Sequence, residues 1–373
     1  MKVVVARADL VGAIGKIQSI VSAKPSIPIL ANILVEAIDD QLVLSATDLS
    51  VSMQCSIEAK VVEEGAIALP ARRFFQLIRE LTSPQVKLHA ETSEIAEITT
   101  GTSVFKIHGM NKQEFPHLPD LSGSLQVPIE NKVLKEALSK TVFSAAREDS
   151  RYTLNGVQLT IAKQHTSFIG TDGKRLAKMT CQVEIDASVH GTYVIPIKAI
   201  EEMVKMLSDS EEKVKLSLTQ DKVSLDLGSM TLIAKLLTGQ YPDVERVIPS
   251  HSVHRFAIHR EELMSLLKQV SLFTSETSHS VKLGFETGQL QLSAASSEVG
   301  EGKVSMPVDF SGEPLDIAFN PFFLLDILRH MNDETIRISL TDSHNPGLIT
   351  DSSNALFVLM PMRLAMSIPT NVS

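Results

Sequence analysis

Two aspartates in similar surroundings, Asp48 in TDLSVSM and Asp172 in TDGKRLAKM, suggest a pair of carboxylates that could take part in acid–base chemistry. A general acid and a general base are often a pair of carboxylates. The third position of the same pattern holds Ser296, so a carboxylate is not kept throughout. Because Asp side chains also accept hydrogen bonds from backbone N–H groups just ahead of them, a turn or capping role is the favoured interpretation.

Other signatures of catalysis or metal binding are missing from the sequence. It contains no Walker loop, GxSxG, HExxH or CxxC motif, and TDGKR and GEGKV lack the spacing of a phosphate loop. His251, His254 and His259 straddle an expected linker and strand without a consistent face, which does not favour a metal site. Cys55 and Cys181 are isolated, so we predict two buried or half-buried thiols. The sequence therefore predicts a protein that is not an enzyme and has no cofactor.

The elements that must position these residues recur three times along the 373-residue chain. The opening segment VVVARADLVGAIGKIQSIV returns as VPIENKVLKEALSKTVFSA and as FAIHREELMSLLKQVSLFT, which aligns Leu10, Leu134 and Leu263. A strand running into a helix appears as ALPARRFFQLIREL, VIPIKAIEEMVKML and AFNPFFLLDILRHM. One period near a third of the chain at several landmarks indicates three homologous domains.

Each repeat combines two amphipathic helices with short alternating strands. Apolar residues at three- and four-residue spacing predict helices over residues 8–24, 71–82, 130–147, 197–208, 259–275 and 321–332. Alternating runs such as KVSLDLGSMTLIAKLL are typical of antiparallel strands. The predicted fold class is α+β, with two helices packed on antiparallel sheet in each domain. Domain boundaries are expected at the Pro-containing connectors, which gives domains at 1–124, 125–250 and 251–373.

The distribution of charge bears on the partner. The formal net charge of -9 would by itself argue against a nucleic-acid partner, because phosphate binding needs Lys and Arg. The predicted helices, however, total +5, so the rest of the chain totals -14. A basic inner surface inside an acidic shell would produce this segregation, although Lys and Arg are also ordinary helix formers. With no Trp and three Tyr, the sequence has no base-stacking pattern, so any DNA binding should be independent of base sequence.

The sequence gives no sign of a membrane partner. No apolar run reaches the roughly 18 to 20 residues of a membrane span. The N-terminal MKVVVARADL lacks the pattern of a signal peptide. A cytoplasmic location is therefore expected.

The chain to Leu364 resembles the bacterial sliding clamp family, the beta subunits of DNA polymerase III. The matching motifs are PILANILVE, TDLSVSM, ALPARRFFQLIREL, RYTLNG, TDGKRLA, YPDVERVIP, FNPFFLLDIL, LTDS and VLMPMRL, in this order. The resemblance implies the DNA clamp fold and a head-to-tail homodimer closed into a ring of six domains around double-stranded DNA. Topological retention needs only weak phosphate contacts, so a negative net charge is then no contradiction. Implied partners are the DNA polymerase III catalytic subunit, the clamp loader and other proteins with clamp-binding motifs.

The same resemblance assigns roles to three groups of residues. Candidates for contact with the DNA backbone are Lys24, Arg72, Arg73 and Arg147. Candidates for the ring interface are Phe105 and Ile107 in a strand and Leu272 and Phe273 at a helix end. Candidates for a cleft between the second and third domains, which takes short peptide motifs of partner proteins, are Leu154, Thr171, Gly173, Lys174, Arg175, Leu176, Pro242, Arg246, Val247, Asn320, Phe323, Val358, Met360, Pro361, Met362 and Arg363.

Two features depart from the family pattern. The chain continues past MRL as AMSIPTNVS, and His344 and Pro346 stand in a loop where small or apolar residues usually border the cleft. These departures leave the preferred motif open. An enzyme is one alternative to a clamp, and the missing catalytic motifs argue against it. A three-domain protein scaffold that never encircles DNA is the other, and the positive charge expected at the pore distinguishes the two.

Overall fold

The computed structural model describes residues 1–363 apart from 23, 92–93, 120, 122, 163–164, 184–189 and 277–278. The first repeat contains β1 (Lys2–Ala6), α1 (Arg7–Ile17), β2 (Asn32–Ile38), β3 (Gln41–Thr47), β4 (Val51–Glu58), β5 (Lys60–Glu63), β6 (Gly65–Pro70), α2 (Ala71–Glu80), β7 (Gln85–Ala90), β8 (Ile95–Thr100) and β9 (Ser103–His108). The second contains β10 (Leu125–Glu130), α3 (Asn131–Val142), β11 (Gly156–Ala162), β12 (His165–Thr171), β13 (Arg175–Gln182), β14 (His190–Pro196), α4 (Ile197–Met206), β15 (Lys213–Leu218), β16 (Lys222–Asp226) and β17 (Met230–Lys235). The third contains β18 (His254–His259), α5 (Arg260–Ser271), β19 (Val281–Glu286), β20 (Gln289–Ser296), β21 (Gly300–Pro307), β22 (Leu315–Phe319), α6 (Pro321–Arg329), β23 (Thr335–Leu340), β24 (Gly347–Thr350) and β25 (Ala355–Leu359).

The predicted α+β class with two helices in each repeat is confirmed, but several helices are shorter than predicted. Helix α1 ends at Ile17 and not at residue 24, and α3 ends at Val142 and not at residue 147. Lys24 and Arg147, which were counted with the helical charges, therefore lie in the turns that follow. The apolar spacing continues beyond α1 because Ile20, which lies in a turn, is fully buried. Burial of this side chain, and not helical hydrogen bonding, explains the spacing.

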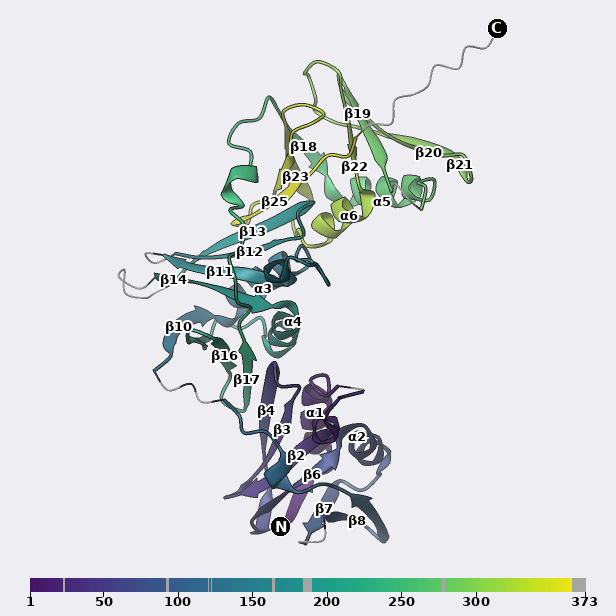
Figure 1. Ribbon diagram of the computed structural model, residues 1–373. Coiled ribbons are helices and arrows are strands. Elements are labelled where there is room, and N and C mark those ends of the chain that lie inside the picture. The colour runs from purple at the N-terminus through teal and green to yellow at the C-terminus, as the bar shows by residue number, and fades with distance from the viewer. Residues whose placement is uncertain are drawn as a thin grey trace. The chain divides into compact units, whose positions relative to one another are not determined.

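One compact unit comprises residues 1–132 and 198–236 and contains two antiparallel sheets. The smaller sheet has the order β5-β1-β7-β8-β9, and the larger has the order β10-β15-β16-β17-β4-β3-β2-β6. Helix α1 lies against β3 and β4 and beside α2 (Figure 1). Strand β17 of the second repeat pairs with β4 of the first, where Leu232 stands opposite Met53. The larger sheet therefore runs across the junction of two repeats.

The other unit comprises residues 133–197 and the chain from residue 237 onward. Its sheets have the orders β14-β11-β12-β13-β25-β24-β23-β18 and β21-β20-β19-β22. Helix α5 lies beside α6 and against β20 and β21. Strand β13 of the second repeat pairs with β25 of the third, with Leu176 opposite Val358. This junction repeats the arrangement of β4 and β17 in the first unit.

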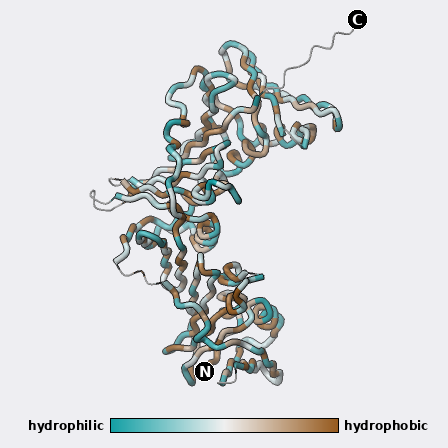
Figure 2. Tube along the Cα trace, in the orientation of Figure 1, coloured by the Kyte–Doolittle hydropathy of each residue, from teal (hydrophilic) through white to brown (hydrophobic). Residues whose placement is uncertain are grey.

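Each unit has an apolar interior built from the faces that the sequence pattern marked. In α1, Leu10, Ile14 and Ile17 are fully buried against the sheet, and each such side chain stabilises the fold by about 1.5–3 kcal/mol. Figure 2 shows the mixture of hydrophobic and hydrophilic residues along both units.

Cys55 and Cys181 are buried, as predicted, and burial raises the pKa of the Cys181 thiol to about 12. Within the described ranges, no helix is long and apolar enough to cross a membrane.

In the first and third repeats, an arginine at the start of the first helix bonds to the second helix. Arg7 Nε donates to the Ile78 carbonyl oxygen (3.2 Å) near the end of α2, and Arg260 Nη1 donates to the Leu328 carbonyl oxygen (3.2 Å) near the end of α6. A cation at the carbonyl end of a helix also interacts favourably with its dipole. In the second repeat Asn131 has this position, and its side-chain oxygen accepts a backbone N–H just beyond α4.

Candidate functional site

The turn between β12 and β13 is organised by its own polar side chains. Asp172 Oδ1 accepts the N–H groups of Lys174 (2.8 Å) and Arg175 (3.0 Å). Thr171 Oγ1 donates to the Arg175 carbonyl oxygen (2.6 Å) and accepts the N–H of Gly173 (3.1 Å), whose φ of 84° suits glycine. Asp48 organises the matching turn in the first repeat. The interpretation of these aspartates as turn residues is therefore confirmed.

Arg175 connects this turn to α6 of the third repeat. Its Nε donates to Asp172 Oδ2 (3.1 Å), and its Nη1 donates to Asp326 Oδ2 (2.8 Å). Its guanidinium lies 4.5 Å from the centre of the Phe323 ring and 5.5 Å from that of Phe143. The side chain is only 11% exposed. Arg175 therefore shapes the site by holding two repeats together and presents little surface to a ligand.

Several predicted site residues meet in one buried apolar cluster. Leu154, Leu176 and Val358 pack there with Tyr241 and Val244, and each of these five is less than a tenth exposed. The Tyr241 hydroxyl donates to the Ile169 carbonyl oxygen in β12 (3.2 Å), which fixes the position of the ring. The three predicted residues are therefore buried, and we call this cluster the floor of the candidate site.

Exposed residues border this floor. Met360 is 38% exposed and Val247 is 41% exposed, while the Arg246 side chain is 85% exposed and its Nε pairs with Asp243 Oδ2 at 2.7 Å. Two backbone hydrogen bonds position the last described segment. The Met360 N–H donates to the Lys174 carbonyl oxygen (2.9 Å), and the Met362 N–H donates to the Ala318 carbonyl oxygen of β22 (2.7 Å). We call this set the candidate partner surface: Lys174, Pro242, Arg246, Val247, Met360, Pro361, Met362 and Arg363.

Asn320 and Phe323, also named from the resemblance, and His344, one of the departures from it, make contacts within the described chain. Asn320 caps α6, since its side-chain oxygen accepts the Phe322 N–H at 2.9 Å, and Phe323 lies under Arg175. His344 is exposed in a turn closed by Asp342, whose Oδ1 accepts the His344 N–H at 2.7 Å. Residues 364–373, including the tail past MRL, lie outside the described residues.

Sequence reasoning missed four residues that shape this site. Tyr241 and Val244 form part of the floor, and Phe143 and Asp326 hold Arg175. The sequence did contain a signal for Tyr241, because an aromatic residue followed by Pro recurs in both connectors as Phe115-Pro116 and Tyr241-Pro242. Nothing local marked Asp326, which lies 151 residues from its partner.

The predicted DNA-contacting residues are exposed but lie in different units. Arg72 and Arg73 project from α2 and are exposed, whereas Phe74 and Ile78 of the same helix are buried. Lys24 is also exposed in this unit. Arg147 is exposed in the other unit, in the turn after α3. Lys and Arg on an amphipathic helix suit contact with phosphates, which do not require base recognition.

The predicted ring-interface residues lie on or beside β9 and β21, which are two of the sheet-edge strands among the described residues. Phe105 of β9 is 37% exposed, but Ile107 is 5% exposed and belongs to the interior. Leu272, at the end of α5, is 72% exposed. Phe273 lies against edge strand β21, where a Cβ at Gly302 would come within 2.4 Å of its ring.

The described ranges contain no group of three or more His, Cys, Asp or Glu side chains that could hold a metal ion. Two of the three histidines near the second connector make contacts within the fold. His259 Nδ1 accepts the Glu262 N–H (3.2 Å) as the cap of α5, and the His254 ring lies 5.1 Å from that of Phe310.

Comparison with known families covers almost the whole chain. Three family models of the DNA polymerase III beta subunit match it: the N-terminal domain at residues 1–119, the central domain at 128–243 and the C-terminal domain at 245–363.

Curated relatives and solved structures agree with this match. The beta sliding clamp of Chlamydia trachomatis is 49% identical over 364 residues, which are 98% of this chain and 87% of that protein. That of Vibrio cholerae is 28% identical over 368 residues, 98% of this chain and 100% of that protein. A crystal structure of the sliding clamp (DNA polymerase III subunit beta) from Pseudomonas aeruginosa bound to griselimycin is 27% identical with a TM-score of 0.93, covering 98% of this chain and 100% of that one. The sliding clamp structure from Bacillus subtilis gives the same values.

Proposed function

Because the chain belongs to the DNA polymerase III beta subunit family, whose members are sliding clamps, we propose that it encircles duplex DNA and tethers the replicative polymerase to it. In this proposal the clamp acts in the cytoplasm as a processivity subunit without a catalytic site of its own. Its three clamp domains span residues 1–124, 125–250 and 251–373, and the connectors with Phe115-Pro116 and Tyr241-Pro242 end the first two.

The observation that carries the proposal is the pattern of strand pairing between repeats. The fourth strand of one repeat in chain order pairs with the last strand of the next repeat. Strand β4 pairs in this way with β17, and β13 pairs with β25. The strands that would continue this series are β21 and β9, which end their sheets within the described chain. Pairing β21 of one copy with β9 of another would form the same junction head to tail. Two copies then close a ring of six domains.

Exposed apolar side chains at both edges support this closure. Val104 and Phe105 on β9 are 54% and 37% exposed, and Leu272 and Val299 beside β21 are 72% and 56% exposed. Burying such residues in an interface removes apolar surface from water and covers two free strand edges. The homodimer in this proposal therefore uses the same edge chemistry as the junctions inside the chain.

DNA retention in this proposal is topological. Lys24, Arg72, Arg73 and Arg147 make weak contacts to phosphates, which salt screens and which allow sliding. The net charge of -9 does not prevent this, because a closed ring holds the duplex without tight binding.

Partner proteins bind the candidate partner surface in this proposal. Its exposed Met360 and Val247 next to a buried apolar floor suit the apolar side chains of a short peptide, and Arg246 can orient it. The clamp loader, the DNA polymerase III catalytic subunit and other proteins with clamp-binding motifs are the expected ligands.

A loading experiment tests the function. The purified protein is loaded onto nicked circular DNA by its cognate loader with ATP, and the DNA is then linearised. Retention on the circle and loss from the linear form is expected for a ring that slides off the ends. Equal binding to both forms would indicate ordinary surface binding. No binding to either form, with the loader active on a control clamp, would favour a scaffold that never encircles DNA.

A further inference from the structure

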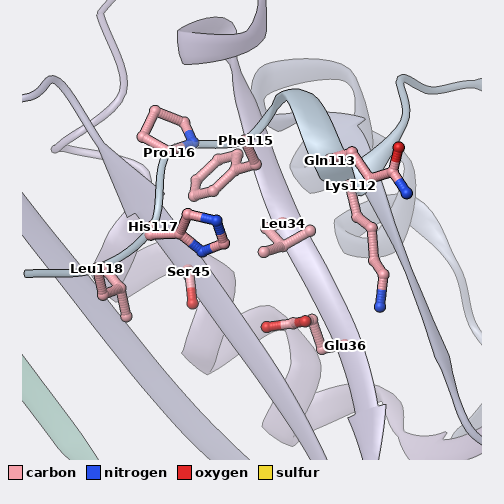
Figure 3. Close-up of a pocket in the computed structure, with 9 residues that line it drawn as sticks. All are labelled: Leu34, Glu36, Ser45, Lys112, Gln113, Phe115, Pro116, His117 and Leu118. Atoms are coloured by element: carbon pink, nitrogen blue, oxygen red, sulfur yellow. The ribbon is translucent and has the colours of Figure 1, made fainter.

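The first repeat contains a pocket that the proposed function does not use. It lies between the outer face of β2 and β3 and the connector at residues 112–118, and its volume is about 370 Å³, within the range of ligand pockets. Figure 3 shows Leu34, Glu36 and Ser45 on the sheet, with the connector residues Phe115–Leu118 crossing over them. Buried Phe115 anchors the connector by packing with Leu30 and Ala68.

The pocket is the counterpart, one repeat earlier, of the region beneath the candidate partner surface. Phe115-Pro116 corresponds to Tyr241-Pro242, and both aromatic rings are buried under a connector that follows the last strand of the repeat. The strand pair Leu34–Ser45 corresponds to Gln158–Ile169. Both repeats therefore place a connector over the same two strands.

Two differences between the repeats explain why space remains in the first one. In the second repeat Ile169 and Tyr241 belong to one apolar cluster, and the Tyr241 hydroxyl bonds to the Ile169 carbonyl oxygen. In the first repeat the smaller Ser45 lines the pocket at the equivalent position, and Phe115 has no hydroxyl to make that bond. The missing side-chain volume leaves a pocket whose walls include the apolar side chains of Leu34, Pro116 and Leu118.

The charge of this pocket differs from that of the candidate partner surface. Glu36 is half-buried on the sheet, and no hydrogen bond or ion pair joins its carboxylate to another described residue. Figure 3 shows this carboxylate directed toward the side of Ser45, with the Lys112 side chain on the other side of the view. The second-repeat counterpart of Glu36 is the neutral Thr160. A partly desolvated carboxylate beside apolar walls favours a ligand that carries a positive charge next to an apolar group.

We propose that this pocket is a second docking site, for an extended segment of a partner protein with an apolar residue and a basic residue two positions apart. Leu34 and Glu36 are two residues apart on one face of β2, and a bound extended segment repeats this spacing because alternate side chains share a face. The apolar side chain packs on Leu34, Pro116 and Leu118, and the basic one pairs with Glu36. A ring clamp thereby holds a second class of partner at a second site.

A direct binding measurement tests this. The probe is fluorescein-labelled Gly-Leu-Ser-Arg-Gly, titrated with the full-length protein to about 1 mM and followed by fluorescence anisotropy. Saturable binding is expected, and Glu36→Gln should weaken it about fivefold, as should replacement of the peptide's arginine by glutamate. Ser45→Ile, which restores the residue of the second repeat, should fill the pocket and abolish binding.

Control variants separate the pocket from other charges and surfaces. Glu63→Gln, an exposed carboxylate on β5, and Met360→Ala, on the candidate partner surface, should leave the probe affinity unchanged. Lys112→Ala should strengthen binding, because it removes from the pocket rim a positive charge that repels the arginine of the probe. Thermal unfolding checks that each variant folds. Absence of saturable binding, or equal affinity for wild type, Glu36→Gln and Ser45→Ile, would overturn the proposal.

The proposal can fail independently of the clamp function. Ser45→Ile protein should still load onto nicked circular DNA and slide off the linearised form, because no junction strand edge is changed. Loss of loading in wild-type protein with intact probe binding would count against the clamp and not against the pocket.

Discussion

At the scale of single residues, the site depends on side chains that are already engaged within the protein. Arg175 is held by Asp172 and Asp326 and stacked on Phe323, so its charge is neutralised inside the fold. The residues left to meet a partner are the exposed ones, such as Met360 and Arg246. In the proposed function, residues that shape the candidate site are thus distinct from the exposed residues that would contact a ligand.

Arg175→Ala should lower the free energy of unfolding by about 1–3 kcal/mol, because it leaves Asp326 without its shortest cationic contact in a partly buried setting. The matched control is Arg246→Ala, whose side chain is 85% exposed and should change stability by less than about 0.5 kcal/mol. Urea unfolding of both variants measures the difference. Equal losses would show that the contacts of Arg175 contribute nothing particular.

His330 should make stability depend on pH. Burial lowers its pKa, and the charges of Arg175 and Arg329 add to this, against the hydrogen bond and charge of Asp326, which raise it. The ring stacks on Phe143 at 4.1 Å, and its Nδ1 donates to the Asp326 carbonyl oxygen at 2.8 Å. The unfolded chain therefore takes up a proton at a higher pH than the native one does. The resulting stability is fully present above the ordinary pKa of about 6.5 and is lost as pH falls through the lowered value.

His330→Gln should flatten the decline of unfolding free energy below about pH 6.5, by at most about 1.4 kcal/mol per pH unit. Urea titrations between about pH 5 and 8 measure this slope, with the exposed His165→Gln as control. An unchanged slope in the first variant would contradict the assignment, whatever its overall stability.

At the scale of elements, the same turn recurs with different residues. The third residue of the Thr-Asp turn is Gly173 in the second repeat and Leu49 in the first, and both have positive φ, 84° and 73°. Only glycine adopts this conformation without cost. The first repeat therefore keeps a strained residue in a turn that Asp48 and Thr47 hold closed.

Leu49→Gly should raise the free energy of unfolding by about 0.5 kcal/mol. Relief of about 1–2 kcal/mol of backbone strain exceeds the entropy that glycine adds to the unfolded chain. Leu49→Ala keeps the strain and is the control, so it should give no gain. The result is measured by thermal unfolding, and a gain in the alanine variant alone would refute this account.

At the scale of the whole molecule, β9 and β21 are the strands equivalent to those that pair between repeats, and each ends its sheet in the described chain. The proposed ring predicts that removing apolar surface beside one edge separates the copies. Leu272→Ala combined with Phe273→Ala should yield monomer in sedimentation velocity at about micromolar concentration. Val62→Ala, at a 54% exposed position on β5, should remain dimeric. A dimer that persists in the double variant at low concentration would contradict the proposed interface.

DNA contact belongs to the same scale because retention depends on the ring and not on one residue. Arg72→Ala should reduce loading modestly and by the same factor on DNA of different base sequences. Loading assays on two unrelated sequences at two salt concentrations measure this. A loss confined to one base sequence would be inconsistent with phosphate contact.

Features that depend on local pattern could be predicted from the amino-acid sequence alone. The period of the repeats, the two amphipathic helices in each and the turn role of Asp48 and Asp172 all follow from residues close together in the chain. Helix ends were less well predicted, because apolar spacing continued through buried turns such as that of Ile20. In a short stretch of sequence, a buried turn and a buried helix face can show the same spacing of apolar residues.

Contacts between residues far apart in the chain could be identified only from the folded structure. The pairing of β4 with β17, the contact of Arg175 with Asp326 and the space left beside Ser45 join segments far apart in the chain. It also showed that Leu154 and Leu176 form a buried floor while Ile107 faces the interior. Such facts have no local signature, because a side chain's exposure and partners are set by strands and helices that fold against it from elsewhere.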